Sequence, residues 1–152
     1  MRLRTLVLTL LLLGIHGAHF VDASSTGITG RTNGCSCHSG GANSFTPAIY
    51  GLPSGGYTGG TTYSLTWDNG GVYISGVGGF NLIATDTSGQ AIMGSWSNLG
   101  FNVQQSGSEL THSAKTSRSW GADWTAPPSG SGTVQFAIAV LLGNGGQSGN
   151  SG

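Results

Sequence analysis

The chain has 152 residues, of which only 7% are charged. Its five Lys or Arg residues balance five Asp or Glu residues. A nucleic-acid-binding domain needs a basic patch or stripe, and this composition therefore excludes nucleic acid as an expected partner. The 29 glycines would suit a disordered chain, but the aromatic content of 9% and the low net charge do not. So little charge leaves little electrostatic self-repulsion, which favours association with a cell surface or with sister molecules.

Residues 1–23 have the pattern of a secretory signal peptide. A short basic start is followed by the uncharged apolar run of residues 5–15, which is shorter than the roughly 20 residues that a transmembrane helix needs. Val21 and Ala23 are compact residues at the −3 and −1 positions of a cleavage site after Ala23. We therefore predict an exported mature chain without a transmembrane segment; the alternative is an uncleaved N-terminal anchor.

Residues 24–44 form a lead rich in Gly and Ser without apolar periodicity, and they are predicted to be a loop held down by whatever their Cys-x-Cys-His segment binds. The pattern then changes. In residues 61–67 Tyr63, Leu65 and Trp67 alternate with Thr and Ser, which predicts a half-buried strand with one wet face. A turn is predicted at residues 68–71, where the sequence is Asp-Asn-Gly-Gly.

Further strands are predicted in residues 78–87, 91–96, 99–105, 119–127 and 133–142. The last of these is apolar on both faces, so it is expected to be a central strand that is covered on both sides. The tryptophans at positions 67, 96, 120 and 124 alternate with small residues, which favours core packing over a sugar-binding face. Residues 143–152 are of low complexity and are predicted to be a flexible tail.

The predicted fold is therefore all-β: an antiparallel immunoglobulin-like sandwich of seven or eight strands over residues 45–142, preceded by the Cys-x-Cys-His loop. No window shows helical periodicity. The Cys…Trp…Cys pattern of true immunoglobulin domains is absent, because both cysteines precede the strands.

Several blocks of the sequence resemble, in order and spacing, those of the choice-of-anchor V domains, which are secreted or surface domains of bacteria and archaea. These blocks are "STGITGRTNGCSCHSGG", "GGFNLIA", "ELTHSA", "WTAPPSGSGTVQFAIA" and "GNGGQSGNSG", and together they extend from about Thr26 to Gly152. The chain is also loosely similar to reeler-type sandwiches. The resemblance implies an extracytoplasmic β-sandwich whose C-terminus often leads to a variable anchor. Many relatives have Cys-x-x-Cys-His, whereas this chain has Cys35-Ser36-Cys37-His38 and ends without a hydrophobic tail, so it is expected to be a fragment, a released protein or one held by other means.

The Cys-x-Cys-His segment has three interpretations. Cys-x-x-Cys-His attaches haem c because two thiolates reach the two vinyl groups while His binds the iron, so a haem would use His38 as the proximal ligand and His112 as the distal one. In an extended chain, however, Cys35 and Cys37 share a face about 6.6 Å apart while His38 points to the other face. A turn at one of the neighbouring glycines would be needed to bring His38 round.

A disulfide between Cys35 and Cys37 is the second interpretation, because an exported chain meets an oxidising compartment and paired cysteines tend to close there. Its loop is very short, so it would contribute little loop entropy and would be comparatively reducible. The third is a zinc or copper site made of Cys35, Cys37, His38 and His112, whose sulfur and imidazole donors suit these metals although the one-residue spacing is unusual.

Catalysis is not predicted, because the sequence contains neither a nucleophile elbow nor a metalloprotease or phosphate-binding motif. The expected function is that of a secreted, surface-associated, non-catalytic module that serves adhesion or surface assembly, with a disulfide-pinned N-terminal loop. Self-association is expected as well. The alternatives are a haem-binding electron-transfer module and a zinc- or copper-binding domain.

Overall fold

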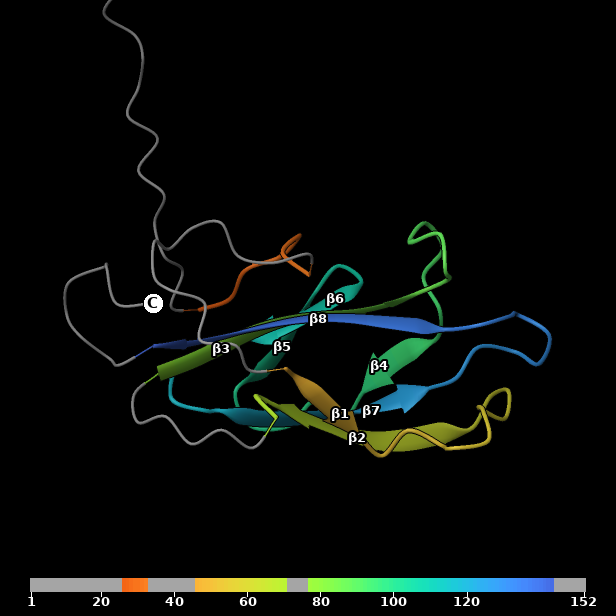
Figure 1. Cartoon of the computed structure of the whole chain (residues 1–152), viewed down its shortest axis with the longest axis horizontal. Helices are drawn as coiled ribbons and strands as arrows, with labels where there is room; N and C mark the ends of the chain where they lie inside the picture. Colours follow the sequence, from red (N-terminus) through yellow and green to blue (C-terminus); the bar gives the residue numbers. More distant parts are fainter. Residues whose placement is uncertain (1–25, 33–45, 71–76, 144–152) are drawn as a thin grey trace, which may run out of the picture.

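The computed structural model describes residues 26–32, 46–70 and 77–143 (Figure 1). The predicted signal peptide, Cys35, Cys37 and His38, and the predicted tail from residue 144 onward lie outside these ranges. In the described ranges no helix is long and apolar enough to cross a membrane.

Two four-stranded antiparallel sheets form a sandwich (Figure 1). Sheet A has the order β1-β2-β7-β4 and sheet B the order β5-β6-β3-β8. The all-β antiparallel sandwich predicted from the sequence is therefore confirmed. The strands are β1 (Ala48–Tyr50), β2 (Thr62–Asp68), β3 (Val77–Thr85), β4 (Ser95–Ser97), β5 (Val103–Ser106), β6 (Glu109–His112), β7 (Ser119–Thr125) and β8 (Gln135–Gly143).

The alternating pattern sets the register of the central pair in sheet A. Leu65 lies opposite Ala122 and Trp67 opposite Trp120, so that the apolar rows of β2 and β7 share the inner face. A shift by one residue would turn both rows outward, which is why a strict alternation specifies the register strongly. The strands predicted at residues 61–67 and 119–127 are confirmed, as β2 and β7.

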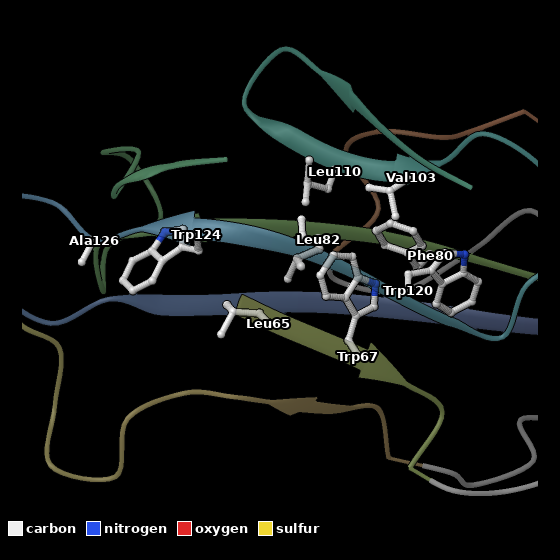
Figure 2. Close-up of a cluster of buried hydrophobic side chains, with 10 residues drawn as sticks. Leu65, Trp67, Phe80, Leu82, Val103, Leu110, Trp120, Trp124 and Ala126 are labelled. Atoms are coloured by element: carbon white, nitrogen blue, oxygen red, sulfur yellow. The ribbon is translucent and has the colours of Figure 1, made fainter. Parts of the chain in front are cut away.

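Aromatic side chains from both sheets meet in the core (Figure 2). The ring centroid of Phe80 on β3 lies 5.1 Å from that of Trp67 and 4.8 Å from that of Trp120. At the other end of the core, Trp124 on β7 lies 5.0 Å from Phe136 on β8. Trp67, Trp120 and Trp124 are at most 3% exposed, which confirms that these tryptophans serve the core. Burial of each such ring stabilises the fold by about 1.5–3 kcal/mol.

The prediction that the segment 133–142 is a central strand is wrong. Among the described residues, β8 pairs with β3 alone and forms one edge of sheet B. Most of its side chains are half-buried, because its outward row consists mainly of small alanines and its inward row lies at the margin of the core. Apolar residues on both faces of a strand indicate contact above and below it, but they do not show whether a second strand lies beside it.

Candidate functional site

The segment 26–32, just before the Cys-x-Cys-His motif in the sequence, lies on the outer face of sheet B without regular secondary structure (Figure 1, orange). Three of its backbone N–H groups donate hydrogen bonds to side chains of the sheet. Ile28 donates to Thr111 Oγ1 at 3.0 Å, Gly30 to Glu109 Oε2 at 2.8 Å and Arg31 to Asn81 Oδ1 at 2.8 Å. Side chains of β3 and β6 thus hold the segment as a neighbouring strand's backbone would.

Thr111 and Asn81 are the buried centre of this docking site, each being 1% exposed. The Thr111 hydroxyl accepts the Ile28 N–H and donates to the carbonyl oxygen of Phe80 at 2.9 Å. The Asn81 amide nitrogen donates to Glu109 Oε2 at 2.7 Å, while its oxygen accepts the Arg31 N–H. Each side chain therefore satisfies groups of the sheet and of the segment at once, as buried polar groups must.

Gln104 on β5 extends the docking site to the start of the segment. Its Nε2 donates to the carbonyl oxygen of Thr26 and, at 3.1 Å, to that of His112. We call Asn81, Gln104, Glu109 and Thr111 the docking residues.

His112, the one predicted ligand that the structure describes, lies at the end of β6 and is 6% exposed. Its Nδ1 accepts the N–H of Phe80 at 3.2 Å, and the carbonyl oxygen of Phe80 is already bonded by Thr111. The same Nδ1 lies 3.3 Å from the carbonyl oxygen of Phe80, to which it donates in the other tautomer. A metal or haem iron could reach this imidazole only if the buried ring became accessible.

Gly79 on β3 provides the room for this imidazole. A Cβ at this position would lie 2.7 Å from Cε1 of His112, closer than real Cβ contacts occur. Gly79 therefore leaves space for the imidazole of His112, and the backbone of Phe80 forms a hydrogen bond with it.

The other three predicted site residues, Cys35, Cys37 and His38, lie outside the described residues, so their role as a disulfide, haem or metal site stays a prediction. The described part of this segment extends to Thr32, three positions before Cys35 in the sequence. Within the described ranges no group of three or more His, Cys, Asp or Glu side chains lies close enough to hold a metal ion.

The carboxylates of the sandwich are spread over different surfaces. Glu109 lies in the docking site on sheet B, whereas Asp123 on β7 accepts a hydrogen bond from Ser64 at 2.6 Å and one from Asn98 at 3.2 Å on the outer face of sheet A. Glu109 and Asp123 therefore do not form the close carboxylate pair that general acid–base catalysis of glycoside hydrolysis uses.

A third carboxylate organises the turn after β3. Asp86 accepts hydrogen bonds from the Ser88 hydroxyl and from the backbone N–H groups of Gln90 and Ala91. The Ser88 hydroxyl and these N–H groups, which favour the ionised form, hold the pKa of the Asp86 carboxyl below its usual value. This site shapes a turn and carries no reactive partner among the described residues.

The docking residues were not predicted from the sequence. In the block Glu109–Ala114 only His112 was predicted to be a ligand, and β6 was not among the predicted strands. The sequence held no signal for the docking residues: Asn81 stands on the outward row between Phe80 and Leu82, where a polar residue is expected to face solvent.

The sequence matches no protein-family model and no curated protein. Similar solved structures are reeler domains. Two are fragments of the human F-spondin reeler domain, both with a TM-score of 0.54, at 22% identity over 66% of this chain and 77% of the other, and at 24% identity over 64% and 78%. A third is the Reelin-N domain of F-spondin, with a TM-score of 0.51 and 23% identity over 66% of this chain and 74% of the other.

These comparisons define the class of fold: the chain is a reeler-like β-sandwich. At such identities the likeness concerns the arrangement of the strands and carries no binding partner with it.

Proposed function

We propose that this chain is an exported, surface-associated and non-catalytic β-sandwich module that serves adhesion or surface assembly, as its resemblance to choice-of-anchor V domains implies. In this proposal Cys35 and Cys37 form a disulfide that closes a small structural loop beside the docked N-terminal segment. Export is supported by the signal-peptide pattern of residues 1–23.

The observation that carries the proposal is the docking of residues 26–31 on sheet B. The four docking residues direct polar atoms to the backbone of the segment or to one another. The outer face of sheet B therefore holds the chain's own N-terminal lead in place. A loop-closing disulfide just after such an anchored segment is in keeping with a structural role.

The bonding of His112 favours this interpretation over the haem and metal alternatives. Its Nδ1 accepts from the backbone of Phe80, and its imidazole is packed against Gly79. Ligation would require this buried ring, which is 6% exposed, to move out of its packing, so His112 is a poor second ligand for an iron held near His38.

Intact-mass measurement of the exported protein tests the chemistry of the loop. The protein is produced in a host that attaches haem c, with metal ions in the medium, and its mass is determined before and after reduction. A deficit of two protons that disappears on reduction is expected. A haem adduct, or two free thiols with a bound metal ion in native mass spectrometry, would overturn the disulfide.

Cell fractionation tests the surface role. We expect the exported protein to sediment with washed cells, and the double variant Cys35→Ser with Cys37→Ser to sediment equally well, since the disulfide only pins a loop. Ser36→Ala is the matched control in the same segment, because it leaves both thiols in place. Complete recovery of the wild-type protein in the culture medium would overturn surface association.

A further inference from the structure

The four edge strands of the sandwich differ greatly in length. β1 and β4 have three residues each and β5 has four, whereas β8 has nine. Natural sandwiches protect their edges with short strands, charges or proline, because an exposed edge pairs readily with another strand. β8, with the sequence QFAIAVLLG, contains no charge and no proline, so it lacks all three protections.

The hydrogen bonds of β3 show which backbone groups of β8 face outward. Gly78, Phe80 and Ala84 direct their backbone groups away from β8, toward Lys115, His112 and Met93, respectively. Residues opposite each other in an antiparallel pair either exchange both hydrogen bonds or neither. Their partners Leu142, Val140 and Phe136, and by the same alternation Ile138, therefore point their N–H and C=O groups to the open edge.

The core is also incompletely closed along β8. Phe136, Ile138 and Val140 contribute side chains to the core but remain partly exposed there. The residues of β8 that point backbone N–H and C=O groups to the open edge thus also carry the partly exposed apolar side chains. A partner that adds a strand to this edge would bond these backbone groups and cover these side chains.

We infer that β8 pairs with β8 of a second copy of this chain, antiparallel across a twofold axis, so that the two B sheets become one continuous sheet. A register centred on Ala139 places Phe136 opposite Leu142 of the second copy and Ile138 opposite its Val140. All outward-facing backbone groups then exchange hydrogen bonds, and the apolar inner rows continue across the axis. The small side chains of Ala137 and Ala139 leave the outer face free of clashes.

A second copy fits this edge better than the chain's own C-terminal residues. Residues 144–152 are Gly, Asn, Gln and Ser, which are poor strand formers, whereas β8 itself supplies an uncharged row of matching length. The neutral chain adds little repulsion between copies. Because the remaining edges have three or four residues, the pairing closes at a dimer and does not propagate.

Cysteine cross-linking tests the register. At the twofold axis the two Ala139 residues form a non-hydrogen-bonded pair with Cα atoms about 4.5 Å apart, within reach of a disulfide. In the Cys35→Ser, Cys37→Ser background, Ala139→Cys is expected to give a covalent dimer on oxidation. Ser106→Cys, an exposed position on the short edge strand β5, is the matched control and is expected to stay monomeric. Equal cross-linking of both variants, or none at Ala139→Cys, would overturn the pairing.

Analytical sedimentation of the exported protein tests the dimer without an introduced cysteine. Ala139→Lys places two like charges opposite each other and is expected to raise the dissociation constant of the dimer at least tenfold, whereas Thr66→Lys on the exposed outer face of β2 is expected to leave it unchanged. Circular dichroism verifies that both variants are folded. A monomer at all concentrations, or open-ended polymers, would overturn the inference.

The inference supplies a partner for the surface assembly proposed above and depends on that proposal only for its biological setting. Cell fractionation of Ala139→Lys separates the two. A folded monomeric variant that stays on the cells leaves surface association standing, whereas a wild-type dimer found only in the medium removes it and leaves the pairing intact.

Discussion

The outer faces of the two sheets both carry polar side chains, but these side chains are used differently. On sheet A, exposed side chains pair across the strands, as Thr62 does with Thr125 at 2.8 Å and Ser64 with Asp123 at 2.6 Å. On sheet B, Thr111 and Asn81 are 1% exposed because the N-terminal segment covers them. The same kinds of side chain thus face solvent on one sheet and form a buried docking site on the other.

This difference determines how much each hydrogen bond contributes to stability. When an exposed hydroxyl is removed, its former partner forms a hydrogen bond with water instead, so the protein loses little stability. Loss of a buried hydroxyl leaves its partners without water, and each of them then carries a desolvation cost of about 1–3 kcal/mol. Substitutions that delete only a hydroxyl should therefore separate the two faces.

The largest effect is expected for Thr111→Val, which keeps the shape of the side chain and removes its hydroxyl. The carbonyl oxygen of Phe80 and the N–H of Ile28 both lose their hydrogen bond to this hydroxyl. We expect the free energy of unfolding, measured with urea, to fall by about 3 kcal/mol. Thr66→Val, on the exposed face of sheet A, is the matched control and is expected to change it by less than about 0.5 kcal/mol.

Trypsin provides a local readout for the same pair of variants. Arg31 lies within the docked segment, and its N–H is bonded to Asn81. Thr111→Val should detach the segment and increase the rate of cleavage after Arg31, since proteolysis follows local opening. Equal cleavage rates in Thr111→Val and Thr66→Val would show that the segment is held by other contacts.

The next largest effect is expected for Gly79→Ala. The new methyl group would meet the His112 imidazole at 2.7 Å and break its fit beside Phe80, lowering the free energy of unfolding by about 2 kcal/mol. Gly55→Ala is the matched control, because it lies in open space with an ordinary backbone conformation. The double variant Gly79→Ala with His112→Ala should lose less than the sum of the two single effects; strict additivity would contradict direct contact between these residues.

The comparison of the faces also shows what the sequence could predict. A strand such as β2 has one buried and one exposed face. The alternation of Tyr63, Leu65 and Trp67 with polar residues therefore predicted both the strand and its inner side. The docking site could not be predicted in this way, because Asn81 and Thr111 resemble solvent-facing residues until the covering segment is placed. That segment is bonded to residues 50 to 83 positions away, a separation that no local pattern encodes.

The position of β8 at a sheet edge could not be predicted from the sequence for a related reason. A strand that is apolar on both faces fits a central place as well as an edge, and only the pairing with β3 alone decides between them. The role of Cys35, Cys37 and His38 likewise depends on which side chains approach them. The proposed disulfide is tested by the intact-mass measurement described above.

A small effect is expected for Ser64→Ala, which removes a hydrogen bond to Asp123 on the exposed face of sheet A. Asp123 keeps its bond from Asn98 and is open to water, so the free energy of unfolding should fall by no more than about 0.5 kcal/mol. A loss as large as that of Thr111→Val, measured by the same urea titration, would mean that the two faces do not differ in the way we describe.

The smallest effect is expected in the turn after β3, where an exposed carboxylate is satisfied by its own loop. Because the folded-state pKa of Asp86 lies below its value in the unfolded chain, its ionised form stabilises the native state. That contribution is present above the unfolded-state pKa and is lost as the pH falls through the folded-state pKa. Asp86→Asn should therefore lower the Tm slightly at neutral pH, and the difference from wild type should vanish in acid. Thr87→Ala in the same turn is the control and should show no such pH dependence. A difference between Asp86→Asn and wild type that persists unchanged in acid would show that the charge of Asp86 contributes nothing to the turn.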